Sequence, residues 1–151
     1  MNKTAISAAF VIGTVIAGLL VGYITLPGEW YAGLAKPPFN PPNWIFGPVW
    51  TVLYILIGRV GARAYFRRVE HPNLLNLWIA LLILNLLWSP AFFGLHQMVL
   101  ALAIIILLLL GIIAFIAIAR KRDPVSAGLF VPYLIWVAFA TLLNASLLYL
   151  N

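Results

Sequence analysis

The stretch VLALAIIILLLLGIIAFIAIA, residues 99–119, contains no charged side chain. A helix needs about 20 consecutive apolar residues to cross the hydrocarbon core of a bilayer, and this stretch is long enough to do so. Three cations, Arg120, Lys121 and Arg122, follow it directly and mark its end. The stretch is therefore predicted to be a membrane-spanning helix.

Four further apolar runs of similar length surround this stretch, at residues 5–26, 44–66, 74–93 and 125–150. The chain of 151 residues is 65% hydrophobic and only 8% charged, whereas a soluble domain has about 25% charged residues. This composition excludes an ordinary soluble protein and a disordered one. We predict an all-α integral membrane protein, a single domain over residues 1–151 folded as a five-transmembrane-helix bundle.

The first run has a second interpretation, because Lys3 precedes it as a cation precedes the apolar region of a secretory signal peptide. Residues 5–26 are longer than the usual apolar region of about 7–15 residues. No Ala-x-Ala cleavage site precedes Pro27. We therefore predict that the run remains in the protein as a membrane helix.

The distribution of Lys and Arg predicts the orientation. Five spans place the two termini on opposite sides of the membrane. One basic residue, Lys36, falls on the far side, and the other eight fall on the side of the N-terminus: Lys3, Arg59, Arg63, Arg67, Arg68, Arg120, Lys121 and Arg122. By the positive-inside rule the N-terminus is predicted to be cytoplasmic. The net charge of +6 is then interpreted as a topology signal. The basic residues can also contact anionic lipid head groups, and no nucleic-acid partner is expected.

Residues 27–43 form the predicted external loop, which contains five prolines and therefore cannot be one regular helix. Residues 29–35 can still form one or two helical turns. The loop is expected to cap the bundle, because irregular backbone is not tolerated in contact with lipid. Trp30, Tyr31 and Trp44 have two interpretations: an interfacial aromatic belt, or a lid over a pocket, which the length and stiffness of the loop favour.

Aromatic and amide side chains recur at three- and four-residue steps in three of the runs, so each set shares one helix face. These faces contain Gly47, Trp50, Thr51, Tyr54, Gly58 and Gly61; then Trp78, Asn85 and Trp88; then Tyr133, Trp136, Ala140 and Asn144. Polar groups need partners in hydrocarbon, so the faces are expected to meet inside the bundle. There the amides either join helices by hydrogen bonds or anchor a ligand in an aromatic cavity.

The polar residues that are missing narrow the function. The only carboxylates, Glu29, Glu70 and Asp123, lie outside the apolar runs, which argues against an ion-driven transporter and against acid–base catalysis. His71 and His96 fall on opposite sides, so no metal site is expected, and each is interpreted as a solvated loop residue. There is no cysteine, which excludes disulfides and thiolate sites. The pair Gly18 and Gly22 is suited to close packing, either inside the bundle or in a homodimer.

Several motifs together resemble the TspO/MBR family, the tryptophan-rich sensory and translocator proteins. They are Trp30-Tyr31-Ala32-Gly33-Leu34, Lys36-Pro37, Pro41-Pro42-x-Trp44, Gly47-Pro48-Val49-Trp50-Thr51-x-Leu53-Tyr54, Asn85-x-x-Trp88-x-Pro90-x-Phe92-Phe93-Gly94 and Pro132-Tyr133-Leu134-x-Trp136-x-x-Phe139-Ala140-Thr141-x-Leu143-Asn144. The resemblance implies five helices, a homodimer, a bacterial cell membrane (with the outer membrane as the alternative), and a pocket for porphyrins such as protoporphyrin IX or haem.

The resemblance also assigns residues. Trp30 and Tyr31 match loop positions over the ligand, Trp50 and Trp136 match pocket tryptophans, and further pocket positions match Asn85, Ala140 and Asn144. Benzodiazepine-type drugs are implied as ligands. Sterol binding is implied more weakly, because no basic residue follows Tyr149 to complete the sterol motif of animal members.

Three functions remain open. The first is a receptor or sensor for tetrapyrroles that needs no cofactor. Its stacking walls are Trp50, Tyr54, Trp88 and Trp136, its polar anchors are Asn85 and Asn144, and Lys36 lies near a propionate. The second is light-dependent breakdown of porphyrin, with Trp50 and Trp136 as the catalytic residues. The third is porphyrin or sterol transport, which no inverted repeat supports.

Overall fold

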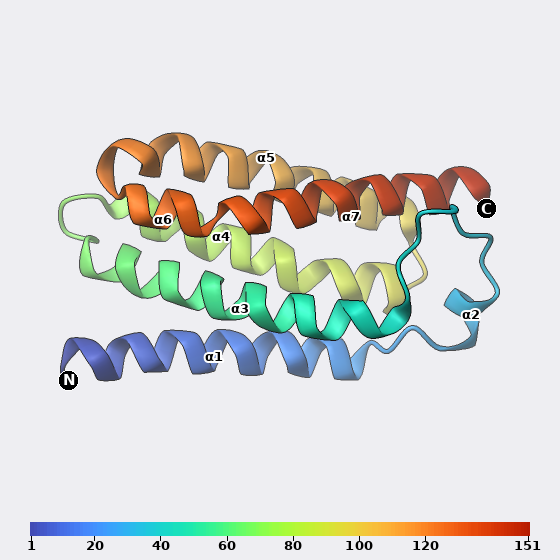
Figure 1. Ribbon diagram of the computed structural model, residues 1–151, viewed down its shortest axis with the longest axis horizontal. Coiled ribbons are helices and arrows are strands. Elements are labelled where there is room, and N and C mark those ends of the chain that lie inside the picture. The colour runs from blue at the N-terminus through green and yellow to red at the C-terminus, as the bar shows by residue number, and fades with distance from the viewer.

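The computed structural model describes all 151 residues and contains only helices and their connections (Figure 1). The elements are α1 (Lys3–Ile24), α2 (Gly28–Ala32), α3 (Asn43–Phe66), α4 (Pro72–Ser89), the π-helix η1 (Pro90–Gly94), α5 (Met98–Arg122), α6 (Pro124–Leu129) and α7 (Val131–Leu150). Five helical segments are long and apolar enough to cross a membrane, with η1 continuing α4 and with α6 and α7 together forming the last. The predicted all-α membrane fold with five spans is confirmed.

Two spans are less regular than their hydropathy indicates, and a proline explains each irregularity. At the end of α4 the helix widens into η1, where the Leu95 amide donates to the carbonyl of Pro90, 2.8 Å away and five residues earlier. The ring of Pro90 disturbs the α-helical ladder at this point. The last span is interrupted at Phe130, between α6 and α7, because Pro132 has no amide proton to continue the ladder.

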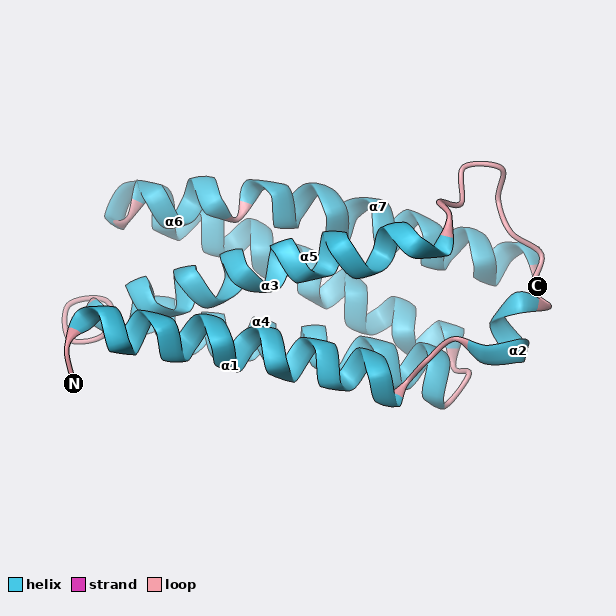
Figure 2. Ribbon diagram, turned by 60° about the horizontal axis from the view of Figure 1, so that its bottom comes forward, coloured by secondary structure: helices cyan, strands magenta, loops and turns pink.

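The five spans run alongside one another, and the bundle has two distinct ends (Figures 1 and 2). One end, here called the N-terminal end, holds the N-terminus, the α3–α4 connection and the α5–α6 turn. The opposite end, here called the α2 end, holds α2, the loop that follows it, and the C-terminus. The eight basic residues grouped from the sequence all lie in the half toward the N-terminal end, and Lys36 lies at the α2 end.

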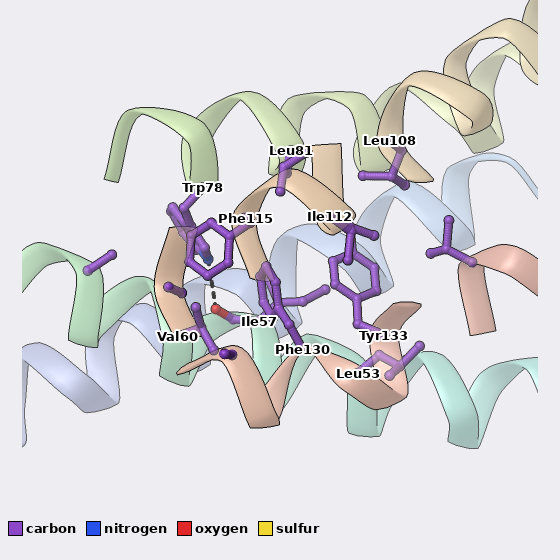
Figure 3. Close-up of a cluster of buried hydrophobic side chains, with 14 of the residues drawn as sticks. Leu53, Ile57, Val60, Trp78, Leu81, Leu108, Ile112, Phe115, Phe130 and Tyr133 are labelled. Carbon is purple, nitrogen blue, oxygen red and sulfur yellow. Dashed lines mark hydrogen bonds between the residues drawn. The ribbon is translucent and has the colours of Figure 1, made fainter. Parts of the chain in front are cut away.

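The half of the bundle toward the N-terminal end has a solid core (Figure 3). Trp78 of α4 lies there among Phe115 and Phe130 and donates its indole N–H to the Ile57 carbonyl of α3, 2.8 Å away. Helix α1 approaches α3 closely, since a Cβ atom added to Gly58 would lie 2.6 Å from the Cα of Val11. Packed side chains fill the core of this half.

An ion pair between Arg63 of α3 and Asp123, between α5 and α6, joins these elements at the N-terminal end. The Arg63 guanidinium donates to both carboxylate oxygens of Asp123, at 3.0 Å and 2.7 Å, and Ser126 donates to the same carboxylate. Burial alone would raise the pKa of Asp123, but the hydrogen bonds from Arg63 and Ser126 and the charges of Arg63 and Arg67 outweigh it and lower this pKa below its usual value. This carboxylate is 2% exposed, and its burial was not expected from its place in a predicted loop.

Candidate functional site: a cavity at the α2 end

A cavity of about 410 Å³ lies in the half of the bundle toward the α2 end. Residues of all five spans border it, together with η1 and the loop after α1. Its volume falls within the range of about 300–1,000 Å³ that is usual for sites of small organic ligands. The cavity is therefore large enough for such a ligand, and its walls decide which chemical class fits.

Glycine on α1 and α3 contributes to the hollow shape. A Cβ atom added to Gly22 or to Gly47 would meet no other atom within 4 Å, and both residues border the cavity. Gly58, on the same predicted face of α3 as Gly47, instead packs against the backbone of α1. One face of α3 thus fills space at one end of the bundle and leaves it open at the other.

Aromatic rings form much of the cavity wall. The rings of Trp50 and Tyr54 are stacked with centroids 5.5 Å apart. Trp136 meets Phe46 edge-on, with a centroid distance of 5.8 Å. Trp88 also borders the cavity, as does Ala140. The predicted wall residues on α3, α4 and α7 are therefore brought together around one space.

The two buried amides join helices and border the cavity at the same time. Asn85 accepts a hydrogen bond from the Tyr54 hydroxyl at 2.9 Å and donates to the Tyr133 hydroxyl at 2.7 Å. Asn144 accepts from the Trp88 indole at 2.9 Å and donates to the Met98 carbonyl at 3.1 Å. The two interpretations of these amides are thus compatible, because each side chain links helices while its residue lies on the cavity wall.

The external loop divides its aromatic residues between different roles. Tyr31 is buried and borders the cavity, as a lid residue would. Trp30 does not border it; its ring stacks on His96 with a centroid distance of 4.1 Å. Trp44 is 73% exposed and points away from the core, as expected of an interfacial belt. The prediction that Trp30 lies over the ligand is not supported by its position, because its ring packs against the turn after η1.

Lys36 also lies off the cavity wall. Its ammonium group donates to the carbonyl oxygens of Tyr31, Leu34 and Ala32 at 2.8, 3.2 and 3.3 Å, and lies 4.6 Å from the centroid of the Tyr31 ring. These contacts use the three donors of the ammonium group within its own loop. The structure therefore assigns Lys36 to holding the loop together and not to the predicted propionate contact.

Among the residues of the site region that were not singled out for it from the sequence, three have a clear structural role. Gly18 borders the cavity and packs so closely on the Tyr54 ring that a Cβ atom would overlap it, so half of the Gly18–Gly22 pair serves packing inside the bundle. His96 adopts a left-handed backbone conformation with φ of 55°. The side chain of Asn151 exchanges two hydrogen bonds of 2.9 Å with the backbone of Ala35 and so ties the loop to α7. Of these three residues, only Gly18 has a recognisable sequence signal, the GxxxG spacing.

The cavity carries no ionisable acid or base that is charged at neutral pH. None of the 27 residues bordering it is Asp, Glu, Lys, Arg or His. One indole N–H on its wall, that of Trp136, is buried without a hydrogen-bond partner. Nowhere in the chain do three His, Cys, Asp or Glu side chains gather in a way that could hold a metal ion. The site is thus suited to binding by shape and aromatic contact.

Comparison with known proteins agrees with this architecture. The TspO/MBR family matches residues 9–150. The chain is 40% identical to the tryptophan-rich protein TspO of Chlorobaculum tepidum over 100% of its own length and 99% of the relative's. It is 37% identical to protein CrtK of Rhodobacter capsulatus, covering 95% and 91% of the two chains. With the human translocator protein it shares 40% identity over 84% and 79% of the two chains. The protein is an integral, multi-pass membrane protein and belongs to the TspO/MBR family.

Proposed function

We propose that this protein is a membrane receptor or sensor that binds a tetrapyrrole such as protoporphyrin IX, or another flat hydrophobic molecule, in the cavity at the α2 end. The observation that carries the proposal is the convergence of Trp50, Tyr54, Trp88 and Trp136 on one uncharged cavity of about 410 Å³. Indole and phenol rings stack on flat π-systems, and each such pair contributes about 0.5–1.5 kcal/mol beyond the burial of area. Membership of a family that includes sensory and translocator proteins supports a receptor role.

The absence of charge from the wall supports one orientation of such a ligand. No cation borders the cavity, and the ammonium group of Lys36 is held by backbone carbonyls. A carboxylate moved into this space would lose its hydration without gaining a partner. The macrocycle of a porphyrin is therefore expected inside the cavity, with its propionates at the mouth.

The distribution of basic residues supports an orientation. With eight of the nine cations toward the N-terminal end, the positive-inside rule favours a cytoplasmic N-terminus. The cavity then lies in the outer half of the membrane, and a bacterial cell membrane is the proposed location.

Titration with protoporphyrin IX in detergent micelles, followed by quenching of tryptophan fluorescence, tests the site. The variant Gly47→Leu places a side chain in the cavity and keeps all six tryptophans as reporters. We expect its affinity to fall at least about tenfold, equivalent to about 1.4 kcal/mol. Gly13→Leu is the matched control, because Gly13 also has open space around it but does not border the cavity. Equal affinities for the wild type and Gly47→Leu would contradict the assignment of this cavity.

Two further titrations examine the walls and the orientation of the ligand. A Trp50→Phe, Trp136→Phe double variant should bind more weakly, by at most about 1–3 kcal/mol, because the two phenyl rings still stack but cover less of the ligand than the indoles do. The dimethyl ester of protoporphyrin IX should bind the wild type at least as tightly as the free acid. A large preference for the free acid would show that a cation contacts the propionates and would contradict the proposed pose.

Light-dependent breakdown of porphyrin is a second candidate, favoured by one observation. Trp50 and Trp136 border the same cavity, so both would contact a bound macrocycle. The activity predicts that the absorption of bound porphyrin decays on irradiation faster with the protein than in empty micelles. Loss of this acceleration in the double variant, with binding kept by a higher protein concentration, would assign it to the two indoles.

A further inference from the structure

Arg59, a cation within the membrane-spanning helix α3, lies on a surface that faces lipid. Arg59 is exposed and follows Val52 and Ile55, which are 56% and 44% exposed, at helical spacing along α3. Steps of four and seven residues place the three side chains on one stripe of the helix. The guanidinium group of Arg59 thus lies on the same lipid-facing stripe as two apolar side chains.

The packing of α3 fixes Arg59 in this position. The preceding residue, Gly58, faces the backbone of α1, and a Cβ atom there would lie 2.6 Å from the Cα of Val11. The following residue, Val60, is completely buried in the core. Rotation of α3 to bury Arg59 would remove both contacts. The side chain therefore stays on the outer surface between them.

Arg59 has no partner within the protein, which distinguishes it from Arg63 on the same helix and from Arg67 and Arg68 just after the helix. Arg63 and Arg67 pair with Asp123 at 2.7 Å and 3.7 Å. Arg68 lies 3.8 Å from the centroid of the Tyr65 ring and donates to a backbone carbonyl. For Arg59 the structure contains no hydrogen bond, ion pair or contact over an aromatic ring. Its five N–H donors remain available for an external acceptor.

The depth of Arg59 identifies that acceptor. Helix α3 ends at Phe66, seven residues later, so the Cα of Arg59 lies about 10 Å along the axis from the helix end. At this depth a guanidinium must extend its side chain toward the interface and pair with an anion there. The anions that a bilayer presents at this level are the phosphates of its lipids, and guanidinium groups bind phosphate with two parallel hydrogen bonds.

A second cation lies on the same side of α3. The ammonium group of Lys3 is 5.7 Å from the centroid of the Phe66 ring, and Phe66 shares a helix face with Arg59 because seven residues make nearly two turns. Lys3 therefore adds positive charge between Arg59 and the membrane surface, where the lipid head groups lie. We propose that Arg59, assisted by Lys3, forms a binding site for the phosphate of an anionic phospholipid in the leaflet at the N-terminal end.

The site can be tested by native mass spectrometry of the full-length protein released from micelles that contain equal amounts of phosphatidylglycerol and phosphatidylcholine. We expect the wild type to retain one phosphatidylglycerol more tightly than any phosphatidylcholine. Arg59→Gln should weaken retention of that lipid about tenfold, whereas Arg59→Lys should lose less because a positive charge remains. The matched control is Arg120→Gln, which removes an exposed cation from the same end of the bundle, in the last turn of α5.

Three outcomes would overturn the proposal. These are unchanged lipid retention in Arg59→Gln, equal retention of the two lipids by the wild type, or the same loss in Arg120→Gln as in Arg59→Gln, which would indicate the diffuse charge of the whole end. Thermal unfolding with added lipid provides a second measurement. Phosphatidylglycerol should raise the melting temperature of the wild type more than that of Arg59→Gln, and inorganic phosphate should raise neither. Stabilisation by inorganic phosphate would identify the site as one for a free anion.

Discussion

The indole N–H of Trp88 donates to Oδ1 of Asn144 across 2.9 Å and so joins α4 to α7 beside the cavity. The amide of Asn144 continues the link to α5 through the Met98 carbonyl. A single side chain thus holds three of the five spans together at the level where the bundle is hollow. The cavity interrupts the packed core at this level, so these hydrogen bonds keep the walls of the cavity in place.

Loss of this link should destabilise the bundle. Asn144→Ala removes both hydrogen bonds and leaves a partly buried indole N–H without a partner. We expect the free energy of unfolding in micelles to fall by about 1–2 kcal/mol, within the range found for interhelical hydrogen bonds in membranes. The control is Asn76→Ala, because Asn76 of the same amide type is exposed on α4. Equal effects of the two substitutions would show that the link contributes nothing.

The close approach of α1 to the Tyr54 ring makes Gly18 sensitive to a single methyl group. Gly18→Ala would place a Cβ atom on that ring, whose hydroxyl is held by Asn85. Overpacking of this kind costs about 1–3 kcal/mol, and we expect a corresponding loss of thermal stability. Gly22→Ala, one helical turn later, meets nothing within 4 Å and should leave stability unchanged or slightly higher. Tolerance of alanine at Gly18 would contradict the packing described for α1.

The ion pair of Arg63 and Asp123 predicts an acid dependence of stability. Because the pKa of Asp123 is lowered in the folded protein, its stabilising contribution is complete above the ordinary aspartate pKa of about 3.9. That contribution is lost as the pH falls through the lower pKa of the folded state. Thermal unfolding measured from pH 7 downward should therefore show a loss of stability below about pH 4.

The variant Asp123→Asn should flatten this acid dependence. At neutral pH it should lower the free energy of unfolding by roughly 3 kcal/mol, near the lower limit for removing one partner of a buried pair. The lower limit applies because the Arg63 side chain is 25% exposed, so water can solvate part of its charge. Glu70→Gln is the control, as Glu70 is exposed and has no ion-pair partner. An acid profile of Asp123→Asn that matched the wild type would exclude Asp123 as its source.

The stack between Trp30 and His96 is expected to hold the external loop against η1. His96→Gly removes the ring but suits the backbone φ of 55°, so the lost stacking of about 0.5–1.5 kcal/mol is offset by about 1–2 kcal/mol of relieved backbone strain. Global stability should hardly change, while hydrogen exchange at residues 29–35 should become faster. His96→Ala keeps the strain and loses the ring, so it should lower stability as well. Unchanged exchange in His96→Gly would mean that the stack does not restrain the loop.

Much of this architecture is readable from the sequence because it depends on local properties. A run such as residues 99–119 must cross a bilayer whatever its neighbours are, since its length and hydropathy alone satisfy that requirement. Helical spacing likewise places Trp50 and Tyr54, or Trp136 and Ala140, on one face without reference to the rest of the chain. The effect of a proline depends on more than its local sequence, because Pro90 widens its helix into η1 and Pro132 follows a break, while Pro48 lies within a continuous α3.

Whether a helix face packs solidly or borders the cavity depends on which residues of other helices lie against it. Gly47 and Gly58 occupy one predicted face of α3, yet only Gly58 meets the backbone of α1, and Gly47 borders empty space. Lys36 has the chemistry to bind a carboxylate, but backbone carbonyls of its own loop already surround its ammonium group. The sequence alone determined the membrane fold, its five spans and the aromatic faces, because periodicity and hydropathy act within one helix. Only the tertiary structure decided where those faces pack solidly and where they enclose a cavity, because that depends on distances between helices that are separate in the chain.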